Sequence, residues 1–101
     1  MVNIPELGTH EQSGARPVVV IAHVTKTIAT IIPCTTNRKA LRFPFTRSIE
    51  PTSRNGLSDT SVALVFHIRA IDVSYFSAKL GELEREALTA LRKQARRLID
   101  G

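Results

Sequence analysis

The chain has 101 residues, 43% of them apolar and 23% charged, and this balance favours one globular domain over residues 1–101 and excludes a disordered chain. No apolar run approaches the roughly 20 residues of a membrane span, and the N-terminus lacks the pattern of a secretory signal, so we expect a cytoplasmic protein with no membrane contact. Lys and Arg number 14 against 9 Asp and Glu, and the resulting charge of +5 favours polyanionic partners, with nucleic acid first.

The single cysteine, Cys34, excludes an internal disulfide and a cysteine metal cluster. We expect it to be a small buried apolar side chain. The spacing of the three His residues gives no metal motif, so the sequence predicts neither a metal site nor a cofactor.

A short polar segment with several reactive groups precedes the first clear strand. Residues 10–17 include His10, Glu11, Gln12 and Arg16. An ordinary His titrates near neutral pH, and a guanidinium stays charged and can fork onto two phosphate oxygens. Taken alone, this composition also fits a solvated surface loop, and both readings stay open at this point.

Residues 1–75 read as β structure, because short β-branched or alternating runs are separated by turn signals. Pro44 places its strand at an edge or at a bulge, and the pair Asn55-Gly56 favours positive φ. The uninterrupted run from Val18 to Ile21 suggests burial on both faces. We expect strands at residues 17–23, about 27–33, about 41–49 and about 61–72, with a polar turn at 35–39 and a loop at 51–56.

Residues 82–100 read as one helix with an apolar stripe at three- and four-residue spacing. Its acidic residues come first and its basic residues last, which suits the helix dipole and is a sufficient structural reason for the charges. The stripe consists of Leu88, Leu91, Ala95 and Leu98. Several short strands with one helix predict a mainly β (α+β) fold, a small closed or nearly closed β-barrel with a packed helix.

Four pieces of the sequence, in their order and spacing, carry a resemblance to a known family. They are His-Glu-Gln-x-Gly-x-Arg-Pro at 10–17, Ile-Ile-Pro-Cys-Thr-Thr at 31–36, Gly-Leu and Ser-Val-Ala-Leu within 56–64, and Ile-Arg-Ala-Ile-Asp at 68–72. Together they resemble the PemK/MazF family of toxin endoribonucleases from toxin–antitoxin pairs, and the first piece is most similar to the Kid-like branch.

The resemblance implies an SH3-like, PemK-type barrel that forms a homodimer and binds single-stranded RNA at the dimer face. It implies metal-independent cleavage by attack of the 2′-hydroxyl on the adjacent phosphate, which leaves a cyclic phosphate and a free 5′-hydroxyl. It also implies a cognate antitoxin protein whose acidic segment blocks the RNA groove. Contact with DNA is expected only through the toxin–antitoxin complex.

The family's functional positions carry over to this chain unevenly. The catalytic arginine matches Arg16, the catalytic threonine matches Thr35, the loop glutamate matches Glu11, and the histidine of the Kid-like branch matches His10. Without the resemblance, Thr35 reads as an ordinary strand threonine. We also expect three RNA-binding residues, namely Gln12 in the loop and Arg38 and Lys39 in the polar turn.

The chain departs from the family pattern at two places. Phe66 and His67 stand where an acidic residue and then Gln are usual, and Leu64 stands where the Kid-like branch has an arginine. The chemistry must therefore follow the arginine–threonine version of the site. His67, on an apolar run, is expected to be a hydrogen-bonded core histidine. The first strand looks shortened before Pro5, as if the start had been placed too late or half a strand were missing.

Two alternatives follow from the same resemblance. One is a catalytically inactive or truncated member that acts through antitoxin binding and repression of its operon, which the short first strand and Phe66 favour. The other is a non-enzymatic toxin similar to the family's gyrase-inhibiting relatives. Arg16 and Thr35 argue against it, because such relatives do not need an RNA site.

Overall fold

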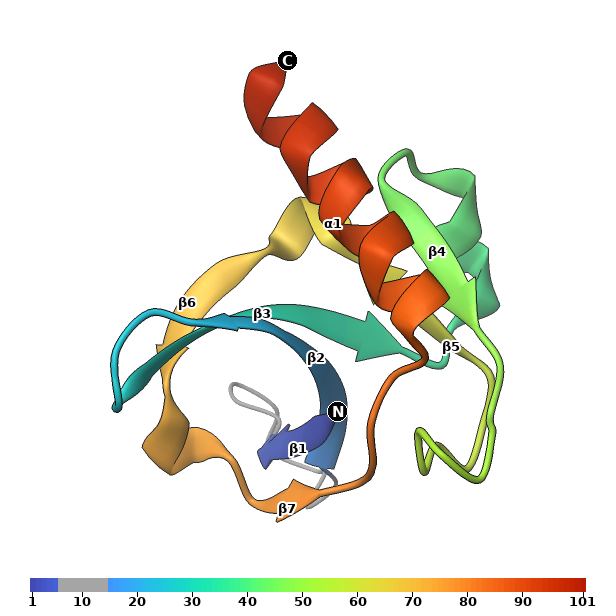
Figure 1. The fold of residues 1–101 in the computed structure, drawn as a ribbon. Coiled ribbons are helices and arrows are strands. Elements are labelled where there is room, and N and C mark those ends of the chain that lie inside the picture. Colours follow the sequence, from blue (N-terminus) through green and yellow to red (C-terminus); the bar gives the residue numbers. More distant parts are fainter. Residues whose placement is uncertain (6–14) are drawn as a thin grey trace.

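The computed structural model describes residues 1–5 and 15–101 and shows a strongly curved antiparallel sheet with one helix lying across it (Figure 1). The strands are paired in the order β4-β5-β3-β2-β1-β7, and β6 pairs with β3 beside this path. Within the described ranges the path does not close on itself, but the curvature fits the predicted barrel-like fold. The elements are β1 (Val2–Pro5), β2 (Ala15–His23), β3 (Ile28–Thr35), β4 (Thr46–Ile49), β5 (Ser61–Leu64), β6 (Arg69–Asp72), β7 (Ala78–Lys79), α1 (Arg85–Asp100) and three short 3-10 helices, η1 (Arg38–Arg42), η2 (Val65–His67) and η3 (Val73–Tyr75).

The central strands β2 and β3 are buried on both faces, as the β-branched runs predicted. Val19 and Ile32 belong to a large apolar cluster beneath α1, whereas Val18 and Ile31 belong to a smaller cluster on the other face. Side chains alternate between the two faces of a strand, so an unbroken apolar run supplies both clusters at once. Cys34 lies in the large cluster and is 1% exposed, which confirms its predicted burial.

Helix α1 begins at Arg85, three residues later than the charge pattern suggested. Its predicted stripe faces the sheet: Leu91 and Ala95 are buried, and Leu88 and Leu98 pack against the same cluster at its margin. Arg92 also donates a hydrogen bond to the carbonyl of Ile21 at 2.8 Å, which joins the helix to β2. No helix among the described residues is long and apolar enough to cross a membrane.

The third predicted strand is much shorter than expected. Only Thr46–Ile49 is extended, as the edge strand β4, and the first part of the predicted run folds as η1. Asn37 caps η1 by accepting a hydrogen bond from the Lys39 backbone N–H at 3.1 Å. Phe45, at φ +58°, then turns the chain into β4. A local cap and a left-handed residue thus override the alternating pattern.

The last predicted strand is divided in two because β3 changes partners along its length. β5 pairs with Cys34 and Thr35, whereas β6 pairs with residues 28–31. The residues between β5 and β6, which pair with neither part of β3, form the turn η2. His67 lies in this turn and is exposed, so its predicted place in the core is wrong.

β1 spans four residues and pairs along one edge with β2 and along the other with the short strand β7. The N-terminal amine of Met1 donates a hydrogen bond to the carbonyl of Gly81 at 2.8 Å. The sequence did not predict β7, because two residues carry no periodic pattern.

Candidate functional site

Arg16 and Thr35 come from the adjacent central strands. The last recorded pair of β2 and β3 at this end is Val18 opposite Pro33. Arg16 lies two residues before Val18 and Thr35 two residues after Pro33, so this register, continued for two residues, would set them level. The recorded pairs at this end are with other strands: Arg16 pairs with β1, and Thr35 pairs with β5. Side chains two residues apart share a face of the sheet. Arg16, which is exposed, and Thr35, which is half-buried, therefore have the same facing as Val18 and Pro33 on their own strands.

Thr35 is the last residue of β3 and is anchored on its other side by β5, where it pairs with Val62. Its Oγ1 accepts a hydrogen bond from the backbone N–H of Asn37 at 3.2 Å. A hydroxyl that accepts one such bond still carries a proton that it can donate and a second acceptor position. The side chain can therefore be held in place and contact a phosphate oxygen at the same time.

The cations predicted to follow Thr35 are presented by η1. Arg38 and Lys39 are its first two residues, both are exposed, and Arg42 ends it. The helix buries none of its residues, so its role in the core is small. Its place directly after Thr35 keeps these cations beside the end of β3.

Three predicted site residues, His10, Glu11 and Gln12, lie outside the described residues. Arg16 and Thr35 are thus the two predicted catalytic residues that the structure describes. In the described part of the chain, no group of three or more His, Cys, Asp and Glu side chains is arranged to hold a metal ion.

Burial separates Thr35 chemically from its neighbour Cys34. Desolvation raises the pKa of the Cys34 thiol to about 12, so the thiol stays protonated at neutral pH. A protonated, buried thiol is a poor nucleophile and a poor metal ligand. Of these two adjacent side chains, only the hydroxyl of Thr35 is suited to contact a substrate.

An aromatic cleft, which the sequence did not predict, lies between the end of η1 and η2. It has a volume of about 460 Å³ and is lined by Phe43, Pro44, Phe45, Phe66 and His67. Two of these residues, Phe66 and His67, are the positions where the chain departs from the pattern that the resemblance implies. Three of the four Phe residues lie within residues 43–66, and this concentration could have indicated the cleft. The interpretation of residues 41–49 as one strand would instead place alternate side chains on opposite faces.

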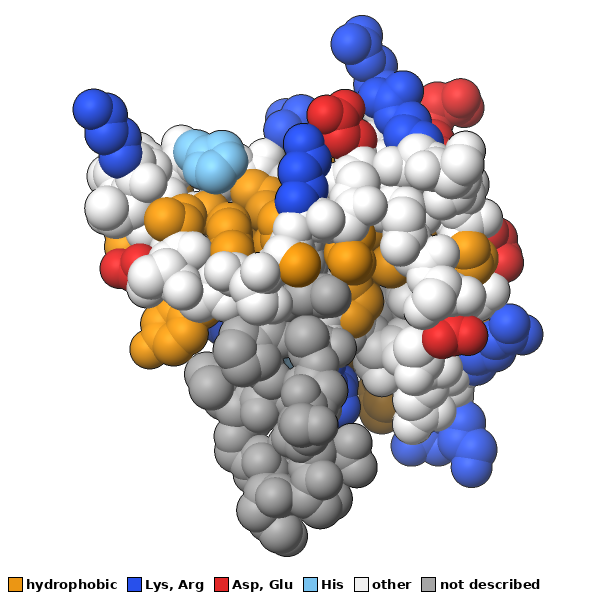
Figure 2. All heavy atoms as spheres, turned by 90° about the horizontal axis from the view of Figure 1, so that it is seen from below, with side chains coloured by type: hydrophobic (Ala, Val, Ile, Leu, Met, Phe, Trp, Pro, Cys, Tyr) orange, Lys and Arg blue, Asp and Glu red, His pale blue; other side chains and the backbone are white. Residues whose placement is uncertain are grey.

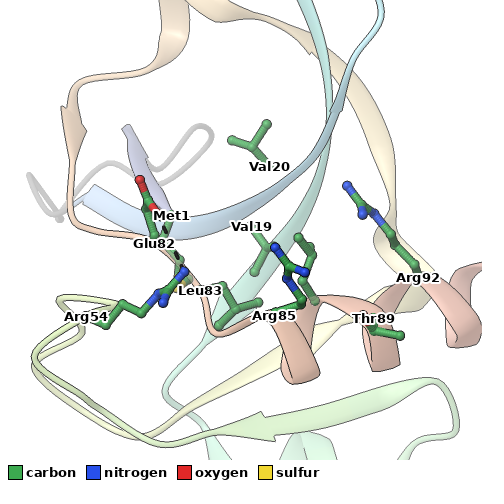
Figure 3. A pocket seen from close by; sticks show the side chains of 10 residues that line it. Met1, Val19, Val20, Arg54, Glu82, Leu83, Arg85, Thr89 and Arg92 are labelled. Carbon is green, nitrogen blue, oxygen red and sulfur yellow. Dashed lines mark ion pairs between the residues drawn. The ribbon is translucent and has the colours of Figure 1, made fainter.

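A larger concavity, of about 590 Å³, lies between β2 and the start of α1 (Figure 3). Arg54, Arg85 and Arg92 line it together with Val19 and other residues. Two of these arginines have protein partners: Arg54 pairs with Glu82 at 3.7 Å, and Arg92 bonds the Ile21 carbonyl. The concavity includes neither Arg16 nor Thr35, and we do not assign the predicted chemistry to it.

Hydrophobic side chains gather in the middle of one face of the molecule, with Lys and Arg side chains around the edge (Figure 2). Acidic side chains also lie at several places around the same edge. A group of exposed apolar side chains with a charged edge is typical of a surface that binds a partner.

Comparison with known proteins identifies the fold and the family. Two of the solved structures that are similar over nearly the whole chain are toxins of known source. The Mycobacterium tuberculosis toxin MazF-mt6 is 22% identical with a TM-score of 0.72, covering 98% of this chain and 95% of that chain. MazF from Deinococcus radiodurans is 24% identical with a TM-score of 0.72, covering 99% and 92%. Among curated protein sequences, no significant match was found.

These structural likenesses establish the fold, and the family rests on a separate comparison. The family model of the PemK-like, MazF-like toxins of type II toxin–antitoxin systems matches residues 1–99. Because this match spans nearly the whole sequence, the chain belongs to that toxin family.

Proposed function

We propose that this toxin-family chain is a sequence-selective endoribonuclease that cleaves single-stranded mRNA in the cytoplasm without a metal ion. The observation that carries the proposal is that Arg16 and Thr35 lie on the adjacent strands β2 and β3, each two residues beyond the Val18–Pro33 pair, with the cations of η1 directly after Thr35 in the chain. A fixed guanidinium, a hydroxyl and flanking cations are groups that a phosphate-cleaving site needs.

In the proposed reaction, the 2′-hydroxyl of one nucleotide loses its proton and forms a bond to the adjacent phosphorus. The bond from phosphorus to the 5′-oxygen breaks, and that oxygen takes up a proton. The products are a 2′,3′-cyclic phosphate and a 5′-hydroxyl, so no external nucleophile is consumed.

We assign Arg16 to the two non-bridging phosphate oxygens, where its forked donors stabilise the extra negative charge of the phosphorane. Thr35 donates a hydrogen bond to the same phosphate. His10 and Glu11 are the proposed proton carriers. A His side chain can exchange a proton near neutral pH, and a carboxylate can orient the imidazole that does so. Gln12 is proposed to contact a base, and Arg38 and Lys39 to contact flanking phosphates.

We test this with Arg16→Ala on a long single-stranded transcript. Removing a preorganised donor of this kind costs about 10²–10³-fold in rate, and we expect a loss of that size in an otherwise folded protein. Arg96→Ala is the matched control, because Arg96 is an exposed arginine on α1 outside the proposed site. Unchanged cleavage by Arg16→Ala would remove Arg16 from the mechanism.

The products and the metal requirement are checked in the same assay. We expect the downstream fragments to accept a 5′ label from polynucleotide kinase without prior phosphatase treatment, because they carry a 5′-hydroxyl. Cleavage should persist in EDTA. Loss of cleavage on chelation, restored by a divalent cation, contradicts the metal-independent reaction.

A second candidate function is supported by Leu64 and Phe66, which replace the arginine and the acidic residue of the Kid-like pattern. In this case the chain binds its antitoxin and supports operon repression without cleaving RNA. The two candidates differ in one result: a wild-type chain that binds the antitoxin but leaves the transcript intact favours the second.

A further inference from the structure

The aromatic cleft at 43–67 offers flat ring faces that the core does not use. The rings of Phe43 and Phe66 meet edge to face, with centroids 6.1 Å apart and planes at 72°. The rings of Phe66 and His67 lie 4.5 Å apart at 57°. Phe43 is 46% exposed and His67 is exposed, so part of this aromatic surface is open to solvent.

One backbone hydrogen bond joins the two walls of the cleft, and two further hydrogen bonds fix the turn that forms one of them. The N–H of Val65, in η2, donates to the carbonyl of Phe45 at 2.9 Å. The hydroxyl of Thr46 donates to the carbonyl of Phe43 at 2.9 Å, and the N–H of Phe43 donates to Ala40 at 3.0 Å. The cleft is therefore formed before any ligand arrives, which lowers the entropy cost of binding.

The cleft is flanked by positive charge. The Arg42 guanidinium carbon lies 5.0 Å from the centre of the Phe43 ring. The segments that supply its lining, residues 38–49 and 64–71, contain five Lys and Arg residues and no Asp or Glu, and Asp100 of α1 lines a neighbouring cavity with Phe45. An anionic ligand is thus favoured over a neutral or cationic one.

The cleft is also tied to the strands that hold Thr35. η1 begins three residues after Thr35, and η2 directly follows β5, the strand that pairs with Thr35. Because β3 and β5 are antiparallel, η1 and η2 leave opposite ends of this strand pair, and the β4–β5 pair, with Thr46 opposite Leu64, brings the two walls together. Phe66 follows Val62, the partner of Thr35, by four residues, or at most about 13 Å at about 3.3 Å per residue, a separation that a single strand of several nucleotides can span.

We propose that this cleft is a nucleobase-binding subsite, in which one base of single-stranded RNA stacks on Phe43 or Phe66. The proposal rests on the proposed function for the nature of the substrate. A base supplies a flat π-face for the rings, and its flanking phosphates supply the anions for Arg38, Lys39 and Arg42. An aliphatic side chain of a protein partner would use the apolar walls but gain nothing from the guanidinium above Phe43. A duplex is excluded as ligand, because its bases are stacked on one another.

The test compares two fluorescent 12-mers of 2′-O-methyl RNA, one of mixed base sequence and one in which every base is replaced by hydrogen. Neither has a free 2′-hydroxyl, so neither can be cleaved, and both carry the same phosphates. Stacking on an aromatic ring typically contributes on the order of tenfold per base, and we expect the wild-type chain to prefer the base-bearing oligomer by about that factor.

Phe66→Leu and Phe43→Leu should each lower this preference severalfold while the affinity for the abasic oligomer is retained. Leu keeps the apolar volume and removes the ring. Tyr75→Leu is the matched control, since Tyr75 is an exposed aromatic residue on η3 outside the cleft. Equal affinity of the wild-type chain for both oligomers overturns the subsite, and so does an undiminished preference in both Phe variants.

A second measurement needs no variant and is independent of their folding. The base-bearing oligomer is made with 5-iodouridine, which crosslinks on irradiation to an aromatic ring stacked against it. We expect mass spectrometry to place the adduct on Phe43, Phe66 or His67. Adducts confined to Tyr75 or to other elements contradict the proposal and leave the cleft to an apolar side chain of a protein partner.

Failure of the subsite and failure of the ribonuclease are distinguishable. If the transcript stays intact but the base preference is present and is lost in Phe66→Leu, the subsite holds and the proposed cleavage does not. If the transcript is cleaved and both ring variants bind the two oligomers as the wild type does, the cleavage holds and the subsite does not.

Discussion

Cys34 and Thr35 are adjacent residues on β3, yet their side chains meet opposite environments. The thiol is in the cluster beneath α1, whereas the hydroxyl is half-buried at the strand end and accepts a hydrogen bond from Asn37. Alternation along the strand accounts for the difference, because successive side chains point to opposite faces. One of the two residues is therefore suited to packing and the other to contact with a substrate.

Replacing Thr35 tests whether its hydroxyl acts on RNA. Thr35→Val keeps the shape and removes the hydroxyl, so we expect the cleavage rate to fall by about 10²-fold, while the lost bond to Asn37 costs stability by about 1 kcal/mol. Thr35→Ser retains the hydroxyl and should recover most of the rate. The rates are measured on one defined transcript. Equal rates for Thr35→Val and Thr35→Ser would show that the hydroxyl has no catalytic part.

The raised pKa of Cys34 predicts a loss of stability at alkaline pH. The ordinary thiol pKa is 9.0, and burial raises it to about 12 in the folded chain. Between these values the unfolded chain releases a proton that the folded chain retains, so unfolding becomes more favourable as pH rises. Cys34→Ala lacks this contribution. From about pH 8 to about pH 10, urea denaturation should show the wild type losing about 1–2 kcal/mol more than Cys34→Ala.

A parallel loss of stability in the two proteins over this pH range would place the thiol in solvent contact. The comparison with Cys34→Ala is needed because lysine and tyrosine side chains titrate in the same range and contribute equally to both proteins.

Among the elements, η1 is the one whose sequence is explained least by packing. It buries none of its residues, and its cations precede the aromatic cleft. Its position is nevertheless fixed, because Asn37 caps its start and Phe45 turns its end into β4. An exposed cationic segment with a fixed position is suited to contact with a polyanion.

Arg38 and Lys39 are therefore expected to set the salt dependence of RNA binding. For single strands, each neutralised phosphate contributes about −0.7 to the slope of log affinity against log salt, so Arg38→Ala with Lys39→Ala should reduce the slope by about 1.4. Anisotropy with the uncleavable base-bearing oligomer at several salt concentrations measures it. Lys26→Ala with Arg54→Ala removes two exposed charges from other parts of the chain and serves as control. An equal change in both double variants would mean that only net charge matters.

At the scale of the whole molecule, we propose that the chain acts as a homodimer, as its family resemblance implies. The face in Figure 2 carries a group of hydrophobic side chains in its middle, which is surface that association could bury. Sedimentation equilibrium should then give twice the chain mass of 11.1 kDa at micromolar concentration. A species of single-chain mass at every concentration tested contradicts the dimer. Any RNA site would then have to be formed by one chain alone.

Local sequence patterns correctly predicted the elements with strong periodicity. They failed where a cap, a left-handed residue or a turn set the backbone geometry. The run 18–21 predicted a strand buried on both faces, and the stripe around Leu91 and Ala95 predicted the helix; both are confirmed. The run 41–49 looked like a strand, but the Asn37 cap and the left-handed Phe45 broke it. His67 looked internal, but the turn between β5 and β6 exposes it.

The sequence by itself determined the apolar runs, the helix, the single buried thiol, the basic charge and the family, because these depend on residue type and short-range order. Only the tertiary structure decided which distant residues meet. The pairing of β2 with β3 joins the strands that carry Arg16 and Thr35, and the pairing of β4 with β5 brings η2 beside the turn after η1, where Phe66 meets Phe43. Such pairings depend on how strands far apart in the chain align, and no local pattern carries that information.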